Sequence, residues 1–314
     1  MVSVKKMKRV LIFIIIAVLI FSIFSFFATK AIYDRTFKRY DCGATEYPAA
    51  LKGMVEARTT HRFLCGKNTL TGYLYSASGE DKKDTLIVLA PGHNSCSDNY
   101  LWQVYELINL GWSVFSFDAT GCCSSKGNSA IGFPQEILDL NAALSYLEDG
   151  GNLGFSNIAI LGHSRGGYAA VCSLRFNKNV SAVVSVSGIN SAMEATLGYA
   201  ENYVGPLAYG NYGFLWLYQA MLFGGKTASL RADKVLESSA VPVLLIHGQD
   251  DTTVPTNKYS IVSHLKENKR ENVEIFIRTA PDNSGHTNLL FAKDGTADDE
   301  VIEKIDQFLN SSIK

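Results

Sequence analysis

The sequence predicts an α/β fold: a doubly wound, mostly parallel sheet of eight strands with a helical cap insertion, preceded by one transmembrane helix. Three observations predict it. An uncharged apolar run lies near the N-terminus. Short apolar strands alternate with helices over residues 57–314, which indicates a parallel sheet covered on both faces. The pattern Gly-His-Ser-Arg-Gly at 162–166 separates one such strand from a helix.

The N-terminal run, residues 10–28, contains only apolar residues and serines. At helical rise these residues span about 28 Å, close to the thickness of a bilayer core. A cleaved signal peptide is the alternative, but the run exceeds the usual apolar region of about 7–15 residues and no A-x-A site follows. We therefore expect a basic tail at 1–9, an uncleaved signal anchor at 10–29 and a neck at 30–56.

The orientation of this span rests on the basic residues around it. Four lie on each side, so the positive-inside rule gives a tie, although the N-terminal cluster is tighter. We expect the short tail inside and the globular domain extracytoplasmic, in a single-pass membrane protein. The flanking residues are Lys5, Lys6, Lys8 and Arg9 before the span and Lys30, Arg35, Lys38 and Arg39 after it.

Composition argues against nucleic acid as a partner and against a metal or organic cofactor. The net charge is −1 and no basic stripe is present, so nucleic acid is not an expected partner. The six cysteines show no metal-ligand spacing, and no metal or organic cofactor is expected.

In an oxidising compartment Cys42 could pair with Cys65, or Cys96 with Cys122 or Cys123. Free or buried thiols are an equal alternative, because a domain of this size does not need disulfides.

The expected strands begin with an antiparallel hairpin and continue as buried apolar runs. Helices are expected between them at about 99–110, at 134–147 with Pro134 in the first turn, at 168–174, and at about 301–309 near the C-terminus. The strands are expected at 58–64, 69–75, 85–90, 112–117, 157–161, 180–186, 241–246 and 273–277.

The connection at 188–240, between the sixth and seventh strands, is longer than a crossover helix requires. We interpret it as a helical cap over the site, lined by aromatic side chains that would accept an apolar substrate. The alternative is a set of helices packed on the sheet, with the aromatics as core. Those aromatics are Tyr199, Tyr203, Tyr209, Tyr212, Phe214, Trp216, Tyr218 and Phe223.

The motif at 162–166 is typical of a nucleophile elbow, in which a sharp turn between strand and helix presents a serine. Its glycines leave room for strand and helix around Ser164. The following helix offers free N–H groups to an oxyanion.

A serine nucleophile needs a base and a carboxylate to orient that base. Two loops after later strands supply them. The strand at 241–246 leads into Asp250 and Asp251, and the strand at 273–277 leads to His286. The chain order Ser, Asp, His is the order of elbow-type hydrolases.

With these motifs the chain resembles the α/β-hydrolase superfamily, in pattern the serine aminopeptidase-like or monoacylglycerol-lipase-like branch, from about Thr59 to the C-terminus. The family pattern H-G-x-x-D-x-x-V-P at 247–255 implies Asp251 as the acid, with Asp250 a neighbouring loop residue. The G-H motif implies His286 as the base. The resemblance also implies an oxyanion hole of backbone N–H groups, one at Arg165 and one at His93 or Asn94.

Three positions depart from the pattern of that superfamily. Asn94 stands where glycine is usual, and Cys122 and Cys123 lie in a loop of usually small or charged residues. The Arg165 side chain would bind a substrate carboxylate or form a salt bridge to a nearby loop. The histidines 61, 163, 247 and 264 are expected to be structural.

We therefore expect a membrane-anchored serine hydrolase that cleaves a small-molecule ester or a peptide bond through an acyl-enzyme on Ser164. An acyltransferase with the same triad is one alternative. A non-catalytic anchored binding protein is the other.

Overall fold

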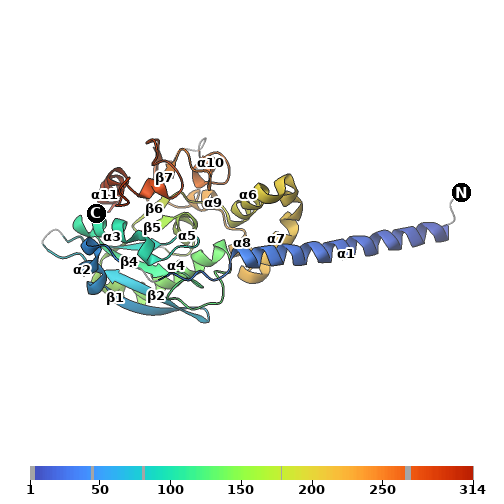
Figure 1. Ribbon diagram of the computed structural model, residues 1–314, viewed down its shortest axis with the longest axis horizontal. Helices are drawn as coiled ribbons and strands as arrows, with labels where there is room; N and C mark the ends of the chain where they lie inside the picture. The colour runs from blue at the N-terminus through green and yellow to red at the C-terminus, as the bar shows by residue number, and fades with distance from the viewer. Residues whose placement is uncertain (1–3, 44–45, 80–81, 178, 266–269, 314) are drawn as a thin grey trace.

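A sheet of eight strands lies at the centre of the protein in the computed structural model, which describes residues 4–43, 46–79, 82–177, 179–265 and 270–313 (Figure 1). The strand order is β1-β2-β4-β3-β5-β6-β7-β8. β2 is antiparallel to both neighbours and the other pairs are parallel, as predicted. The strands are β1 Thr59–Cys65, β2 Asn68–Tyr75, β3 Thr85–Ala90, β4 Ser113–Asp118, β5 Asn157–His163, β6 Ala182–Val186, β7 Val243–Gly248 and β8 Val273–Arg278.

The central strands are buried on both faces because helices cover each side of the sheet. In β3, Leu86 and Val88 face one apolar cluster, and Ile87 and Leu89 face another. α4 and α5 contribute to the first cluster, and α3 and α11 to the second. The covering helices are α2 Ala49–Ala57, α3 Leu101–Asn109, α4 Phe133–Asp149, α5 Arg165–Ser173, α10 Ile261–Leu265 and α11 Asp299–Ser312, with 3-10 turns η1 Ser97–Tyr100, η2 Gly151–Gly154 and η4 Asn288–Leu290.

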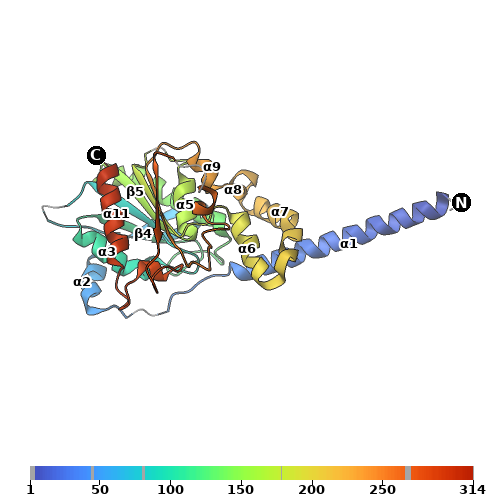
Figure 2. The same cartoon turned by 90° about the horizontal axis from the view of Figure 1, so that it is seen from above.

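The connection between β6 and β7 is helical, as predicted. Its elements are α6 Ala192–Val204, η3 Gly205–Asn211, α7 Tyr212–Phe223, α8 Gly225–Ala228 and α9 Ala232–Leu236. α6 and α7 project from the body of the domain and lie beside α1 (Figure 2). Met193, Leu197 and Leu215 form a small buried cluster with Tyr33 and Phe37 of the N-terminal segment.

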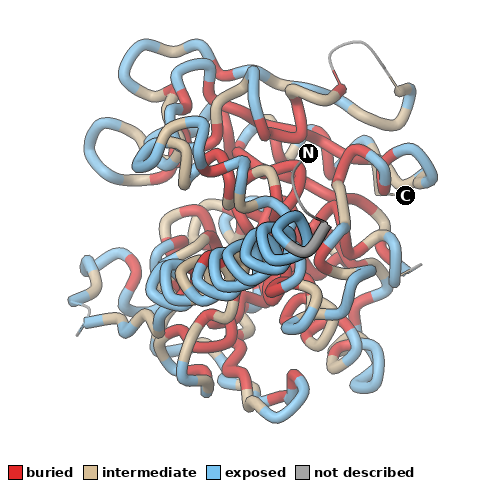
Figure 3. The backbone as a smooth tube through the Cα atoms, turned by 90° about the vertical axis from the view of Figure 1, so that its right-hand side faces the viewer, coloured by how far each residue is buried: buried red, intermediate tan, exposed pale blue. Residues whose placement is uncertain are grey.

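The N-terminal helix α1 runs over Val4–Thr36, and Met1–Ser3 of the expected basic tail lie outside the described residues. Within the described chain it is the one helix with the length and apolar composition to cross a membrane. Its residues are exposed over most of its length (Figure 3). It continues without a break through the end of the expected anchor, and only its last turns pack on the domain.

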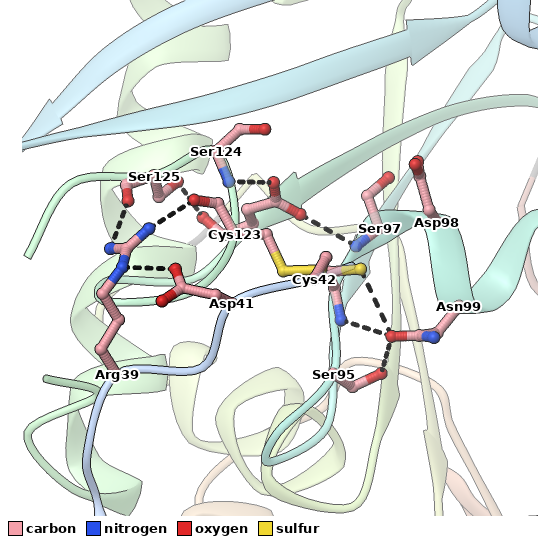
Figure 4. Close-up of a disulfide and its surroundings, with 12 residues drawn as sticks. Arg39, Asp41, Cys42, Ser95, Ser97, Asp98, Asn99, Cys123, Ser124 and Ser125 are labelled. Carbon is pink, nitrogen blue, oxygen red and sulfur yellow. Dashed lines mark hydrogen bonds and ion pairs between the residues drawn. A yellow bond between two sulfur atoms is a disulfide. The ribbon is translucent and has the colours of Figure 1, made fainter. Parts of the chain in front are cut away.

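The segment after α1 is bound to the domain through Arg39 and Tyr40. The Arg39 guanidinium donates hydrogen bonds to the carbonyl oxygens of Cys123, Ser125 and Gly127 at 2.6–3.0 Å (Figure 4). Tyr40 exchanges backbone hydrogen bonds with the same loop. The neck then forms α2, whose Leu51 is buried against the sheet.

A disulfide joins Cys42 of the neck to Cys123 of the loop after β4 (Figure 4). Both pairings considered from the sequence are therefore wrong. Cys65 is buried at the end of β1 beside Gln135 of α4, away from the neck. Cys96 is a free thiol that hydrogen-bonds Asn99, although its sulfur lies within 4.8 Å of both disulfide sulfurs.

Replacing Cys42 by serine is expected to lower the free energy of unfolding by about 2–4 kcal/mol, because the bond joins two residues that are 81 positions apart in the sequence. Denaturant unfolding with and without reductant measures this. Cys96→Ser is the control, and its stability should still respond to reductant. Equal stability of oxidised and reduced wild-type protein would contradict the expectation.

Candidate active site

Ser164 lies at the tip of the turn between β5 and α5, with φ 56° and ψ −115°. Positive φ is strained for a residue other than glycine, so the surrounding structure must hold it there. The neighbouring glycines are required by space. A Cβ on Gly162 would lie 2.2 Å from the carbonyl oxygen of Gly166, and one on Gly166 would lie 2.1 Å from that of Ala90. The predicted elbow geometry is present.

Three loops bring Ser164, His286 and Asp251 into hydrogen-bond contact. The Ser164 hydroxyl donates to Nε2 of His286 at 2.9 Å, and Nδ1 of His286 donates to Oδ2 of Asp251 at 2.8 Å. Ser164 is 9% exposed and Asp251 4%, so the relay is largely shielded from water. Such an arrangement can remove the serine proton and stabilise the imidazolium that forms.

Asp251 is held as a carboxylate by its surroundings. Its Oδ1 accepts hydrogen bonds from the backbone N–H groups of Thr253 and Val254 at 2.9 and 2.7 Å. Burial acts to raise the pKa of Asp251, but hydrogen bonds from His247, His286 and Val254 outweigh it and hold this pKa below its ordinary value. Nε2 of His247 also donates to the Val254 carbonyl at 2.7 Å, which fixes the turn.

Asp250 has a different environment from its neighbour. Its carboxylate accepts a hydrogen bond from the Ser284 hydroxyl, and the residue is exposed. This contact ties the loop after β7 to the loop that carries His286. Asp250 is therefore a loop residue, as the sequence pattern implied.

A cavity of about 290 Å³ lies beside Ser164. It is lined by Ser164 and His286 and by the loop after β3, including His93, Asn94 and Ser95. The lining residues described here come from loops of the central sheet and not from the insertion at 188–240. The aromatic lining expected from that insertion is therefore not seen at this cavity.

Two elements beside Ser164 carry the residues predicted to form the oxyanion hole. α5 begins at Arg165, and first-turn N–H groups of a helix lack helical acceptors. The loop after β3 carries Asn94 at φ 51°, the left-handed region that glycine would adopt easily and asparagine tolerates better than most residues. The departure from glycine is thus compatible with the turn. The side chain of His93 packs between Phe37 and Phe133.

The side chain of Arg165 is 1% exposed and is not among the residues that line the cavity. Its Nη2 lies 2.6 Å from a carboxylate oxygen of Glu136, in the first turn of α4, and 3.4 Å from the Gly92 carbonyl. Burial raises the pKa of Glu136, and the Arg165 charge opposes that rise. Of the two roles considered for this arginine, a salt bridge is observed, but its partner lies on a helix rather than a loop.

The prolyl oligopeptidase family model, Peptidase_S9, matches residues 134–314, which is more than half of the chain and includes Ser164, Asp251 and His286. The chain belongs to the prolyl oligopeptidase family. It is a serine hydrolase with the α/β-hydrolase fold, which confirms the superfamily predicted from the motifs. A comparison with curated protein sequences finds no match.

Solved structures similar to this prolyl oligopeptidase family member include both esterases and a peptidase. The Pyrococcus furiosus esterase Pf2001 is 19% identical, with a TM-score of 0.66 over 88% of this chain and 100% of the esterase. The esterase Est1E of Butyrivibrio proteoclasticus, with ferulic acid bound, is 17% identical, with a TM-score of 0.59 over 80% and 98%. The Pyrococcus horikoshii acylaminoacyl peptidase is 17% identical, with a TM-score of 0.59 over 86% of this chain and 44% of the peptidase.

In this member of the prolyl oligopeptidase family a second chain of hydrogen bonds holds the backbone of His286 in place. Nε2 of His163 donates to the backbone carbonyl of His286 at 3.0 Å. Its Nδ1 therefore accepts from the Tyr100 hydroxyl at 3.0 Å, and the Tyr100 oxygen accepts from the Gly92 N–H at 2.9 Å. The chain joins the base to the loop after β3. The sequence gives no sign of Tyr100, because only tertiary packing brings it to His163.

Two histidines of this prolyl oligopeptidase family member, His163 and the partly exposed His93, are expected to make its stability depend on pH. Burial lowers the pKa of His163 to about 3; burial and then Arg165 lower that of His93 to about 3. An unfolded histidine titrates near about 6.5. Below that pH the unfolded chain binds protons that the folded protein does not, so the free energy of unfolding falls as the pH decreases from about 6.5 towards 3.

Urea unfolding across this range checks the expectation. His163→Gln removes one of the two titrating groups, so its free energy of unfolding should depend less steeply on pH below about 6.5. The same slope for the variant and the wild type would refute the role given to His163.

Proposed function

We propose that this protein is a membrane-anchored serine hydrolase that cleaves a carboxylic ester or a peptide bond through an acyl-enzyme on Ser164. The observation that carries the proposal is the unbroken relay from the Ser164 hydroxyl through the ring of His286 to the buried carboxylate of Asp251.

In the proposed reaction, Oγ of Ser164 attacks the substrate carbonyl carbon while Nε2 of His286 accepts the hydroxyl proton. The N–H of Arg165 and a backbone N–H at His93 or Asn94 hold the oxyanion. Collapse expels the alcohol or amine, which takes the proton from His286. Water then attacks the acyl-serine with His286 again as base, and Asp251 orients the ring throughout.

The bond cleaved is either an ester or an amide. The family is that of prolyl oligopeptidase, which favours a peptide, and one similar structure is an acylaminoacyl peptidase. Two other similar structures are esterases. A panel of p-nitrophenyl esters of graded chain length beside aminoacyl anilides separates these substrates. No metal or organic cofactor takes part in the proposed steps.

A fluorophosphonate probe tests the proposed nucleophile directly. It should label the wild-type protein but not Ser164→Ala, whose unfolding transition serves as the control for folding. Absence of labelling in both proteins would favour the non-catalytic binding protein. Addition of alcohol or amine acceptors tests for an acyltransferase, since transfer to the acceptor in preference to water would replace hydrolysis as the assigned reaction.

The proposed membrane placement has a tail at 1–9, an anchor at 10–29, a neck at 30–56 and the hydrolase domain at 57–314, with its insertion at 188–240, on the extracytoplasmic side. The exposed apolar surface of α1 supports the anchor. The disulfide Cys42–Cys123 supports an oxidising compartment. Protease added to intact cells should degrade the domain, and a protected domain would reverse the proposed orientation.

A further inference from the structure

We infer that the outer face of the insertion docks on the lipid bilayer that α1 crosses. We define this cap face by six residues of α6, η3 and α7, namely Tyr203, Leu207, Tyr212, Trp216, Leu217 and Met221. The inference rests on the proposed anchoring by α1 and adds a second, interfacial contact.

The cap lies against the part of α1 where the apolar run ends. The ring of Phe26, inside the run, is 6.1 Å from that of Tyr218 in α7, and the Tyr33 ring is 5.4 Å from it. The Tyr218 hydroxyl donates to Asp34 at 2.5 Å. α7 therefore lies beside the last turns of α1, on the side of the domain from which α1 projects (Figures 1 and 2).

The cap face is apolar and unusually exposed. Tyr203 is 79% exposed, Leu207 78% and Met221 68%. Residues 202–225 contain no Lys, Arg, Asp or Glu. A soluble protein rarely exposes so apolar a surface to water, whereas tyrosine and tryptophan gather at the level of lipid headgroups. The helix α7, which carries four of these residues, contacts the apolar run of α1 through Tyr218 and Phe26, and this favours a bilayer over a separate protein as the occupant.

The attachment of the neck keeps the cap face directed towards the membrane. The hydrogen bonds of Arg39 and the disulfide of Cys42 hold the segment after α1 on the domain. Tyr33 and Phe37 pack against the insertion itself. Residues 33–42 are therefore held on the domain at several points, which opposes rotation of the cap away from the lipid.

Depth-dependent fluorescence quenching tests the inference on the full-length protein in vesicles of phosphatidylcholine carrying nitroxide-labelled lipid. Cysteine is introduced at Leu207 or Met221 and labelled with a fluorophore. The free native cysteines are buried, so the label goes to the new site. Phe176→Cys, 52% exposed and beyond the C-terminus of α5, is the control on the domain, and Phe21→Cys is the reference within α1.

Labels at positions 207 and 221 should lose fluorescence to nitroxide lipid, and the label at 176 should not. Quenching at 21 with none at 207 and 221 overturns the docking while leaving the anchor intact. No quenching at 21 overturns the proposed anchor itself. Labels at 207 and 221 that are shielded from a water-soluble quencher but not reached by lipid quencher overturn the docking in favour of contact with a second copy of the chain.

Discussion

Asp251→Asn is expected to lower kcat about 10⁴-fold, whereas Asp250→Asn should leave kcat within a few-fold of wild type. The amide cannot replace the carboxylate that accepts the Nδ1 hydrogen of His286 at 2.8 Å. It favours the wrong tautomer of the ring and does not stabilise the imidazolium. The Asp250 carboxylate instead accepts a hydrogen bond from Ser284, in the loop of the base.

Steady-state kinetics on one chromogenic ester measures both variants. They differ by one position in the same loop, so each is the matched control for the other. Their unfolding transitions should both remain cooperative, because the asparagine at either position is isosteric with aspartate. A larger loss of kcat in Asp250→Asn than in Asp251→Asn would refute the assignment of the acid.

Glu136→Gln is expected to lower the free energy of unfolding by about 3–5 kcal/mol, because it leaves the Arg165 guanidinium buried without its counter-ion. Arginine keeps its charge at all accessible pH values, so the penalty cannot be relieved by loss of a proton. Arg165→Met should cost less, since a buried glutamate left alone can bind a proton and become neutral.

Urea unfolding of the two single variants and of the double variant Glu136→Leu with Arg165→Met measures this pair. The double variant should recover much of the stability lost in Glu136→Gln, because no charge is then left in the core. A double variant as unstable as Glu136→Gln would show that the ion pair is not the source of the loss.

The sheet and the catalytic candidates could be predicted because a local sequence pattern indicates each of them. The buried strands are continuous apolar runs, and Ser164 lies between two glycines that leave space only for backbone. Asp251 and His286 follow strands of the same sheet, so a parallel topology brings them to one edge.

Contacts that depend on tertiary packing alone could not be predicted from the sequence. Glu136 looks like an ordinary acidic residue in the first turn of a helix, and nothing near it points to Arg165. The hydrogen bond between Tyr100 and His163 could not be predicted for the same reason. The predicted cysteine pairings were wrong because the partner of Cys42 depends on how the neck folds back on the domain. The sequence shows no strand or turn that fixes the path of the neck.

The attachment of residues 33–42 to the domain has a geometric consequence under the proposed membrane anchoring. A domain on a flexible tether would sample many heights and tilts, but here Arg39 and Cys42, which directly follow α1, bind the loop after β4. With the proposed anchor in a bilayer, this attachment would keep the cavity beside Ser164 at one height and one orientation relative to the lipid plane. Under the proposed anchoring, substrates would reach the site only at that height, so insertion of a flexible spacer between α1 and Arg39 should widen the range of distances from the bilayer at which substrates are hydrolysed.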